Sequence, residues 1–348
     1  MRINFVLPRT TNKPVGGYKI IYQYAKRLSK EGNDVHIYYL LFQGNILTTF
    51  LRKIEGQIFK DKYRKVDWFN LQGVKLHFDQ TTENIINISD GKIIATHWST
   101  ADVVYRSNCK LANKFYLIQG YENFDPAVTE KKLDATWHLP LKKIVISKWL
   151  YKKGLELGIN ENDMSYVPNF IDTKEYPILE DERQDRKMIS FLWHNNPQKQ
   201  SSMGISVATA LKTKFPNLEI VMFGANITDH PKNIKIINNA SVNQLNNIYR
   251  HSLVYFMPSR LEGWGLTGME AMACGAAVVS VDNGGIWEYA NNKSAIIVKN
   301  KEKELLNAIC SLITDSSKRD KLTSNAYREI KKLTLDEAYK KFLKVLNS

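Results

Sequence analysis

The chain has 348 residues, of which 43% are hydrophobic, so it can bury cores of its own and is not a disordered chain. This length favours two domains over one. Lys and Arg outnumber Asp and Glu by 49 to 35, and the excess is larger in the first half. A basic first half suits nucleic acid, anionic lipid or phosphorylated substrates, and it can also serve solubility alone.

The cysteines and the apolar runs indicate which cellular compartment the protein occupies. Cys109, Cys274 and Cys310 are far apart and form neither a metal-spaced pair nor a disulfide framework, which suits a reducing compartment. The apolar run at the N-terminus is interrupted by Pro8 and is too short for the core of a signal peptide. No stretch approaches the roughly 20 apolar residues that a membrane span needs, so we expect no transmembrane helix.

The first half alternates predicted strands and helices. Residues 2–7 form a buried apolar run, a loop with Gly16 and Gly17 follows, and apolar residues at helical spacing continue to Gly32. Residues 34–41 then form a second strand. This is a βαβ unit, the start of an open parallel sheet, and ligands of such sheets bind at the carboxyl ends of the strands. The two glycines therefore belong to a candidate cleft wall, or simply to a turn.

Two more stretches of this half suggest function. Residues 50–69 mix basic with aromatic side chains, which suits an anionic membrane surface and equally a solvated helix face. His97 stands at the end of a predicted strand, where catalytic groups gather, although a structural role is as plausible. The strands of this region are predicted within residues 92–104, 114–124, 142–150 and 164–172.

A highly charged segment with little apolar content, residues 173–187, is predicted to be a linker. It separates a first α/β domain, residues 1–172, from a second, residues 188–332. A C-terminal helix at about 333–348 is expected to pack back on the first domain. The strands of the second domain are predicted at 188–194, 218–224, 234–238, 254–257 and 276–282, with amphipathic helices between and after them.

The stretch 255–275 has the strongest chemical signal. A short strand ends at Pro258, a turn with Gly263 and Gly265 follows, and a helix runs to Gly275. The unpaired amides at a helix N-terminus and the positive end of the helix dipole favour an anion such as a phosphate. The sequence therefore predicts an anion site where this helix begins.

Two carboxylates, Glu262 and Glu270, bracket this turn with seven residues between them. A ribose presents a vicinal diol to a carboxylate, so Glu270 is a natural ribose ligand, and Glu262 suits the hydroxyls of a second sugar. Glu270 also suits the N-terminal half of a helix as a charge alone. Lys199 and Arg260 could neutralise a diphosphate. These residues by themselves suggest an enzyme of a sugar nucleotide or another diphosphate.

These motifs resemble the retaining nucleotide-sugar glycosyltransferases of family four, which have the GT-B fold. The resemblance implies an α/β fold class with two Rossmann-like domains facing across a cleft. LIQGYENF at 117–124 is also similar to the subset with bacterial rhamnosyltransferases and other surface-polysaccharide enzymes. The motifs that carry the resemblance are the Gly-Gly loop with its helix at 14–28, residues 146–172, PSRLEGWGLTGMEAMACGAAVV at 258–279 and DNGGIWE at 282–288.

In the second domain the resemblance implies a donor site. Glu270 would hold the ribose of the donor nucleotide, and Glu262 would face the donor sugar near its reacting carbon. The backbone of Gly265, Leu266 and Thr267 would hold the diphosphate. The donor would therefore bind around the N-terminus of this helix.

Further roles follow from the same resemblance. Lys199 matches the family's loop lysine that meets the phosphates. Gly16 and Gly17 would let the backbone of the first domain approach the donor phosphate or the acceptor, and His97 would lie near the donor sugar. The resemblance thus implies Glu262, His97 and Lys199 as catalytic residues.

The diphosphate site departs from the family pattern. The family usually has an Arg five residues before the loop lysine, where this chain has His194. Arg260 or a protonated His194 would have to substitute for it as a donor-binding residue. In addition, Gln200 stands where the family commonly has a glycine.

The implied reaction moves a hexosyl or deoxyhexosyl group from a nucleotide-diphosphate sugar to a glycan or lipid-linked acceptor. It retains the anomeric configuration and serves bacterial cell-surface polysaccharide synthesis. The nucleotide sugar is a co-substrate, and neither a cofactor nor a metal is implied, because no Asp-any-Asp motif is present. The alternatives are a non-catalytic nucleotide-sugar-binding partner of a synthase and a GT-B sugar-nucleotide epimerase or phosphorylase.

The basic charge leads to two further expectations. Nucleic-acid binding ranks last, because no nucleic-acid module accompanies the charge. The charge fits a cytoplasmic enzyme that contacts the anionic inner face of the cell membrane peripherally and acts there on lipid-linked acceptors.

Overall fold

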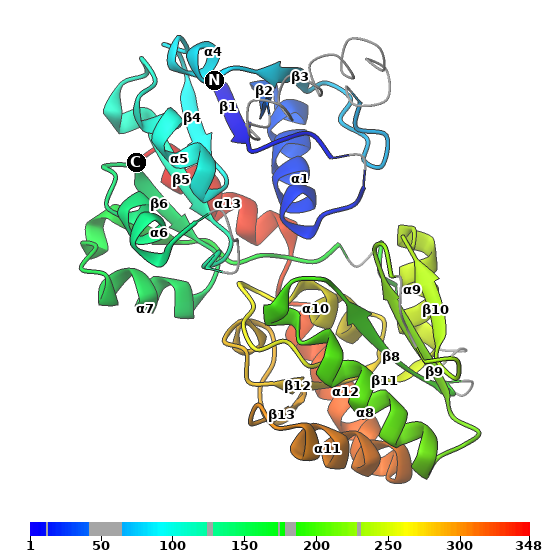
Figure 1. Ribbon diagram of the computed structural model, residues 1–348. Helices are drawn as coiled ribbons and strands as arrows, with labels where there is room; N and C mark the ends of the chain where they lie inside the picture. Colours follow the sequence, from blue (N-terminus) through cyan, green and yellow to red (C-terminus); the bar gives the residue numbers. More distant parts are fainter. Residues whose placement is uncertain (12, 42–64, 124–127, 173–174, 178–185, 228–230) are drawn as a thin grey trace. The chain divides into compact units, whose positions relative to one another are not determined.

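A computed structural model describes residues 1–348 except 12, 42–64, 124–127, 173–174, 178–185 and 228–230. The chain divides into two compact units: unit 1 is Met1–Val167 with Tyr339–Ser348, and unit 2 is Pro168–Ala338 (Figure 1). Most of the basic stretch at 50–69 and of the predicted linker therefore lies outside the described residues. None of the described helices combines the length and the apolar character that a bilayer span requires.

In the described part of unit 1, seven strands form one parallel sheet in the order β3-β2-β1-β4-β5-β6-β7. A parallel sheet is covered by helices on both faces, so its central strands are buried, as all five residues of β5 show. The strands are β1 (Arg2–Leu7), β2 (Asp34–Leu40), β3 (Lys75–Gln80), β4 (Lys92–Ala95), β5 (Lys114–Ile118), β6 (Lys142–Val145) and β7 (Met164–Tyr166).

The helix predicted after the double glycine is confirmed as α1 (Gly16–Lys30). It buries Ile20, Ile21 and Leu28, among others, against the sheet and ends before Gly32, whose φ of 81° suits a glycine. The remaining described helices of this unit are α4 (Thr82–Ile86), α5 (Trp98–Tyr105), α6 (Glu130–Trp137) and α7 (Lys148–Glu156), with short 3-10 turns η1 (Leu111–Asn113) and η2 (Glu161–Asp163).

In the described part of unit 2, six strands form a second parallel sheet, in the order β10-β9-β8-β11-β12-β13. The strands are β8 (Met188–Trp193), β9 (Glu219–Gly224), β10 (Lys235–Asn238), β11 (Ser252–Met257), β12 (Ala277–Val281) and β13 (Ile296–Val298). The helices are α8 (Ser201–Lys214), α9 (Val242–His251), α10 (Leu266–Ala273), α11 (Glu302–Thr314) and α12 (Ser316–Ile330), with 3-10 turns η4 (Pro197–Lys199) and η5 (Gly285–Glu288).

This sheet order positions the candidate site. Strands β8, β11 and β12 are direct neighbours and run in the same direction, so the loops that follow them meet at one edge of the sheet. Beneath these loops lies a continuous apolar core that includes Phe191, Leu211, Phe256 and Val279. The loops therefore rest on a rigid base.

Several elements differ from the sequence-based expectation. The edge strands β3 and β13 were not predicted, because neither contains a fully buried residue and β13 has three residues only. The short helices α4 and α6 were not predicted either. The strand predicted within 164–172 ends at Tyr166, before Pro168, which has no N–H to donate to a neighbouring strand.

The last described helix, α13 (Leu335–Leu346), runs from unit 2 into unit 1. Phe342 is fully buried and stacks on Tyr24 at 4.4 Å and on Phe5 at 6.3 Å between ring centroids. Tyr339 donates a hydrogen bond to the glutamate that follows α1. This part of the chain therefore completes the core of unit 1.

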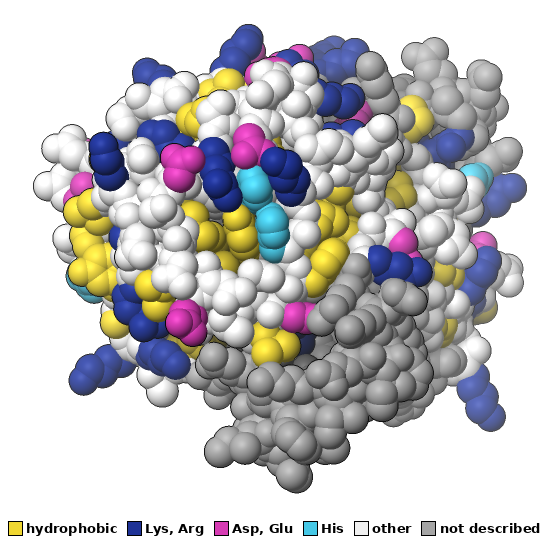
Figure 2. Space-filling model, turned by 90° about the horizontal axis from the view of Figure 1, so that it is seen from above, with side chains coloured by type: hydrophobic (Ala, Val, Ile, Leu, Met, Phe, Trp, Pro, Cys, Tyr) yellow, Lys and Arg dark blue, Asp and Glu magenta, His cyan; other side chains and the backbone are white. Residues whose placement is uncertain are grey.

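A stack of rings lies on one face of β2 and β3. The centroid of His77 lies 5.1 Å from that of His36 and 4.3 Å from that of Tyr38. His36 Nδ1 is 2.8 Å from His77 Nε2, and His36 Nε2 is 3.0 Å from Asp34 Oδ2. Seen from above the view of Figure 1, histidine side chains reach the surface between basic and acidic ones (Figure 2).

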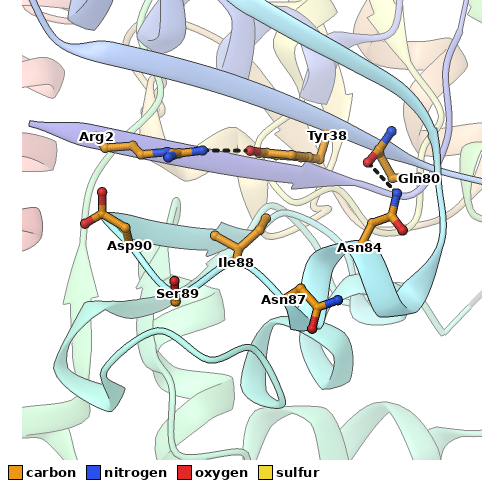
Figure 3. A pocket seen from close by; sticks show the side chains of 8 residues that line it. All are labelled: Arg2, Tyr38, Gln80, Asn84, Asn87, Ile88, Ser89 and Asp90. Atoms are coloured by element: carbon orange, nitrogen blue, oxygen red, sulfur yellow. Dashed lines mark hydrogen bonds between the residues drawn. The ribbon is translucent and has the colours of Figure 1, made fainter.

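Beside this stack lies a polar cavity of about 440 Å³ (Figure 3). Arg2 donates a hydrogen bond to the Tyr38 hydroxyl at 3.3 Å, and Asn84 donates one to Gln80 Oε1 at 3.1 Å. None of the residues that line the cavity is a predicted site residue. It is therefore separate from the candidate site described below.

The pKa of His77 predicts an acid sensitivity of the fold. Burial lowers this pKa, and the charges of His36, Arg2 and Lys75 add to the effect. The unfolded chain then takes up a proton at higher pH than the folded chain. The contribution to stability is therefore present above the ordinary histidine pKa of about 6.5 and is lost as the pH falls below it.

We expect the Tm to fall between roughly pH 7.5 and roughly pH 5.5, and to fall less steeply in His77→Gln. Differential scanning calorimetry across this range measures both slopes. His138→Gln, at an exposed histidine of the same unit, is the control and should keep the wild-type slope. Equal slopes for His77→Gln and the wild type would contradict the prediction.

Candidate active site

The loop between β11 and α10 forms the centre of the candidate site. Gly265 precedes α10 with a φ of 87°, a conformation that L side chains rarely adopt. Within the described parts of the chain, no group accepts a hydrogen bond from the amides of Leu266 and Thr267. These amides and the positive end of the α10 dipole can therefore bind an anionic group.

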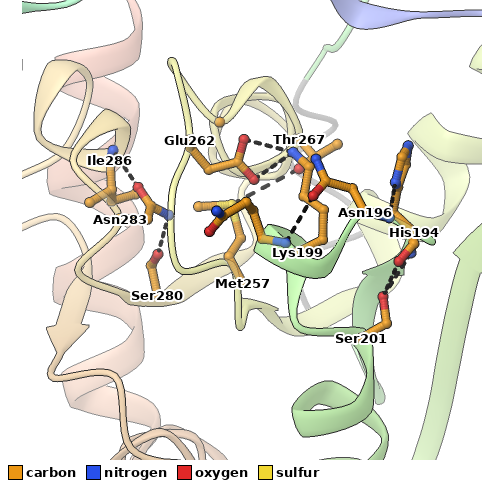
Figure 4. A network of polar contacts seen from close by, with 12 residues as sticks. His194, Asn196, Lys199, Ser201, Met257, Glu262, Thr267, Ser280, Asn283 and Ile286 are labelled. Atoms are coloured by element: carbon orange, nitrogen blue, oxygen red, sulfur yellow. Dashed lines mark hydrogen bonds and ion pairs between the residues drawn. The ribbon is translucent and has the colours of Figure 1, made fainter. Parts of the chain in front are cut away.

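Lys199 and Glu262 form a largely buried ion pair beside this helix (Figure 4). Lys199 Nζ lies 2.7 Å from both carboxylate oxygens of Glu262, and the Glu262 side chain is 9% exposed. Lys199 comes from the loop after β8 and Glu262 from the loop after β11. A Cβ added at Gly265 would lie 3.7 Å from Glu262 Cγ, so the pair adjoins the start of α10.

Arg260 connects the same two loops. Its amide donates to the Gln198 carbonyl at 2.7 Å, and its Nε donates to Gln198 Oε1 at 2.9 Å. Gln198 is buried, whereas Arg260 is exposed. Gln198 could not be identified from the sequence, where its only signal was a position in a polar loop after a strand. Arg260 is thus anchored next to Lys199 with its charge near solvent.

Gln200 follows the loop lysine in a left-handed backbone conformation, with φ 47° and ψ 46°. This conformation costs an L residue roughly 1–2 kcal/mol and costs glycine little. It explains why a glycine suits this position, where the family commonly has one. The buried Gln200 Oε1 accepts no hydrogen bond from any described residue. Backbone strain therefore lies directly beside Lys199.

His194 takes the place at which the family has an arginine. The Asn196 amide donates to His194 Nδ1 at 2.9 Å, and the Ser201 hydroxyl donates to the His194 carbonyl at 2.7 Å. Surrounding protein atoms and the Lys199 ammonium lower the pKa of His194, even though part of the side chain is exposed. Both effects disfavour the imidazolium, so these observations favour Arg260 for this role.

Glu270 lies in α10 and is mostly buried. Its Oε1 accepts a hydrogen bond from Tyr176 at 2.9 Å, and its Oε2 accepts one from Tyr249 at 3.2 Å. Neither tyrosine could be found from the sequence, because they stand 94 and 21 residues away along the chain. The carboxylate is thus held from both sides.

The segment after β12 supports the Glu262 loop. The Glu262 amide donates to the Asn283 carbonyl at 3.0 Å. The Asn283 side chain donates to the Ser280 hydroxyl of β12 and accepts from the Ile286 amide (Figure 4). Gly285 packs directly on the backbone of Trp264: a Cβ at this glycine would lie 2.6 Å from the Trp264 carbonyl oxygen. Only a residue without a side chain fits here.

Gly285→Ala is expected to destabilise the protein by about 1–3 kcal/mol, because the added methyl group must push the backbone of the Glu262 loop away. Urea denaturation measures the change in the free energy of unfolding. Gly120→Ala is the matched control, because a Cβ there would have no atom of the described residues within 4 Å, and it should unfold like the wild type. An unchanged denaturation midpoint in Gly285→Ala would show that the contact carries no such constraint.

The predicted residues of unit 1 follow three neighbouring strands, β1, β4 and β5. Gly16 and Gly17 open α1, and the Gly17 carbonyl accepts a hydrogen bond from Gln119 Nε2 at 3.2 Å. His97 caps α5, and its Nε2 lies 3.5 Å from Glu122 Oε1. These groups meet at the carboxyl edge of the unit 1 sheet. Glu122 could not be singled out from the sequence, since its pairing with His97 depends on the fold.

The unit 2 residues Lys199, Glu262, Arg260, Glu270 and the start of α10 thus form one connected site, and the unit 1 residues form another group. Within the described residues, no group of three or more His, Cys, Asp or Glu side chains could hold a metal ion. The expectation that the enzyme has no resident metal stays a prediction.

Comparison with known proteins gives both a fold and a family. Residues 172–329 match the model of the family described as "Glycosyl transferases group 1". A structure of S. aureus TarM in complex with fondaparinux, alpha-GlcNAc-glycerol and UDP has 12% identity and a TM-score of 0.76, with 100% of both chains covered. No curated protein matches the sequence.

Two further solved structures are similar. Anabaena HepE in complex with UDP and glucose has 14% identity and a TM-score of 0.74, covering 100% of this chain and 99% of that chain. WaaG, described as a glycosyltransferase involved in lipopolysaccharide biosynthesis, has 12% identity and a TM-score of 0.66, covering 99% of this chain and 100% of that chain. At these identities the similarity establishes the fold alone.

The fold is therefore GT-B, with two Rossmann-like domains, as the sequence predicted. The family match covers most of unit 2 and identifies it as a group 1 glycosyl transferase domain. The predicted family resemblance is confirmed at this level, and the chain is a glycosyltransferase.

Proposed function

We propose that this glycosyltransferase moves a hexosyl or deoxyhexosyl group from a nucleotide-diphosphate sugar to a glycan or lipid-linked acceptor, with retention of the anomeric configuration. The observation that carries the proposal is the Lys199–Glu262 ion pair beside the amides of Leu266 and Thr267, which have no hydrogen-bond acceptor among the described residues. A cation and backbone amides suit a diphosphate, and a carboxylate suits sugar hydroxyls. UDP in the TarM and HepE structures supports a nucleotide-sugar donor.

In the proposed mechanism unit 2 binds the donor. Lys199, Arg260 and the amides of Leu266 and Thr267 stabilise the negative charge that develops on the leaving diphosphate. This diphosphate accepts the proton of the incoming acceptor hydroxyl on the same face of the sugar, so no protein nucleophile is needed. Glu262 orients the donor sugar. The protein contributes positioning and charge stabilisation, without a resident cofactor or metal.

Unit 1 is the proposed acceptor domain. Its candidate groups are the loop with Gly16 and Gly17 and the His97–Glu122 pair, which gather at the carboxyl edge of its sheet. The glycan and glycoside ligands of the TarM structure support a glycan acceptor, and the description of WaaG supports a role in surface-polysaccharide synthesis.

We further propose that the enzyme is cytoplasmic and contacts the inner face of the cell membrane peripherally. Its net charge of +14 supports attraction to anionic lipid. Sedimentation with anionic vesicles at low salt tests this part. A protein that stays in the supernatant at low salt would argue against it.

A donor screen tests the enzymatic proposal. Purified protein is incubated with UDP-, GDP- and dTDP-sugars, with and without a crude lipid-linked acceptor extract, and release of the nucleoside diphosphate is followed. We expect acceptor-stimulated release from one donor, and NMR of the product should show the anomeric configuration of the donor. An inverted product would overturn the retaining mechanism.

The same screen separates the alternatives. Tight binding of one donor without turnover would indicate a non-catalytic partner of a synthase. Release of a free sugar without acceptor, or a dependence on inorganic phosphate, would indicate an epimerase or a phosphorylase. Either result would replace the transferase proposal.

A further inference from the structure

The polar cavity of unit 1 lies on the face of the sheet opposite α1. Tyr39 donates a hydrogen bond to Tyr22 of α1, so the neighbouring side chain, Tyr38, points to the other face, where it lines the cavity. The cavity volume of about 440 Å³ lies within the ~300–1,000 Å³ range of small-molecule sites. The cavity is therefore large enough for a ligand of its own.

The loop between α4 and β4 forms one wall of this cavity and is fixed through its backbone (Figure 3). Asn4 is fully buried and donates from Nδ2 to the Asp90 carbonyl at 3.0 Å. The Cys109 thiol, also buried, donates to the Ile88 carbonyl at 3.3 Å. These bonds hold the loop in place before any ligand binds.

The opposite wall is fixed through its side chains. Arg2 donates from Nη2 to the Tyr38 hydroxyl at 3.3 Å and from Nε to Asn4 Oδ1 at 3.4 Å. The Tyr38 ring stacks on His77 with 4.3 Å between the centroids. A cavity with two rigid walls is preorganised, which lowers the entropic cost of binding a ligand.

The first wall also carries polar groups that the fold does not use. Ser89 and Asp90 are exposed, and neither side chain forms a hydrogen bond or an ion pair with the described residues. Arg2 supplies the positive charge of the lining and Asp90 the negative charge, and the structure shows no direct ion pair between these two residues. The lining thus has both signs of charge and no net charge.

The lining favours one class of ligand. A carboxylate accepts hydrogen bonds, a guanidinium donates them, and a carboxamide or a hydroxyl does both. Sugar hydroxyls also donate and accept, so they can pair with each of these groups, while the C–H groups of a sugar ring can pack on Ile88. An anion such as phosphate needs a surplus of positive charge, which this lining lacks. An apolar ligand would leave the polar groups unpaired.

We propose that the cavity is a non-catalytic saccharide-binding site, which holds a sugar unit of the acceptor glycan away from the reacting hydroxyl. None of the groups proposed to act at the reaction centre lines it. The saccharide site is argued from the cavity alone, whereas the identity of its occupant as part of the acceptor rests on the proposed function.

Saturation-transfer difference NMR on the full-length protein tests the site with the methyl glycosides of glucose, galactose, N-acetylglucosamine and rhamnose. We expect at least one glycoside to bind. In Asp90→Ala its dissociation constant should rise at least about tenfold, the range of one hydrogen bond to a charged group. Ser89→Trp, which fills the cavity with an indole ring, should abolish binding. Either variant alone decides the question if the other does not fold.

Glu83→Ala is the matched control. Glu83 is an exposed carboxylate of α4 that does not line the cavity, so this variant should bind the glycoside like the wild type. Inorganic phosphate is the anion probe, and phosphate bound in place of the glycosides would overturn the proposal. The proposal also fails if no glycoside binds, or if Asp90→Ala and Ser89→Trp bind it as the wild type does.

Kinetics then test the occupant, with the donor from the screen and acceptor glycans of increasing length fractionated from the active extract. In the wild type KM for the acceptor should fall as the glycan lengthens, and Asp90→Ala should lose this dependence. The same dependence in both proteins would overturn the acceptor as occupant. If no donor is turned over while glycoside binding depends on Asp90, the proposed function fails and the saccharide site stands.

Discussion

Lys199→Ala and Glu262→Ala are each expected to lower turnover at least ~100-fold, the usual effect of removing a group that stabilises a transition state. In the proposed mechanism Lys199 stabilises the charge of the leaving diphosphate, and Glu262 is the partner of the donor sugar. Their 2.7 Å contacts indicate that donor binding must share or exchange the ion pair. Steady-state kinetics with the donor from the screen measures kcat for each variant.

Because the ion pair is buried, the turnover of the single variants needs a control for loss of protein stability. Lys199→Ala leaves Glu262 buried without its cation, which is costly in itself. The double variant Lys199→Ala/Glu262→Ala removes this penalty, and we expect its turnover to stay as low as that of the worse single variant. Lys214→Ala, at an exposed lysine at the end of α8, should keep wild-type turnover. Recovery of turnover in the double variant would mean that Lys199 serves only to neutralise Glu262.

Phe342→Ala is expected to destabilise the protein by about 3–5 kcal/mol, because it removes a fully buried ring and leaves a cavity. The ring stacks on Tyr24 and Phe5, so the cavity opens in unit 1 although the residue lies near the end of the chain. Thermal denaturation followed by circular dichroism measures the loss.

Lys344→Ala provides the comparison, since Lys344 lies on the same helix and is exposed. It should unfold like the wild type. If Phe342→Ala and Lys344→Ala had the same Tm, the end of α13 would not be part of the core of unit 1. Limited proteolysis offers a second readout, because cleavage of the Phe342→Ala protein should begin within unit 1.

The central strands were predictable because a strand buried on both faces is a largely apolar run. This is the pattern of β1 and β11, which were predicted at or near their observed positions. The edge strand β3 has only partly buried or exposed residues and shows no such run. Sequence patterns therefore predict the middle of these sheets better than their edges.

The chemistry of the candidate site was also predictable in part. Lys199 and Glu262 lie directly after strands and Glu270 lies in the helix that follows one. Ligand-binding groups gather at this edge of a parallel sheet, so these residues could be singled out from the sequence. Their partners could not, because each depends on packing between distant segments. Tyr176 is the clearest example: it lies within a stretch predicted as a linker from its charge, and its buried hydroxyl binds Glu270.

Backbone geometry is a second feature of the candidate site that could not be predicted from the sequence. The left-handed conformation of Gln200 and the close approach of Gly285 to Trp264 are results of tertiary packing. A glutamine gives no sign of a left-handed backbone. A glycine indicates some constraint but does not identify the backbone that it touches.

Residues 339–348 are synthesised after the whole of unit 2, although they belong to unit 1. Domains generally fold as units during synthesis, the N-terminal one first. Here residues 1–167 leave the ribosome before the helix that covers Phe5 and Tyr24 has been made. The apolar surface of these two residues stays exposed while some 170 further residues are synthesised. Unit 1 therefore begins to form first and is finished last, and the nascent chain is most prone to aggregation in that interval.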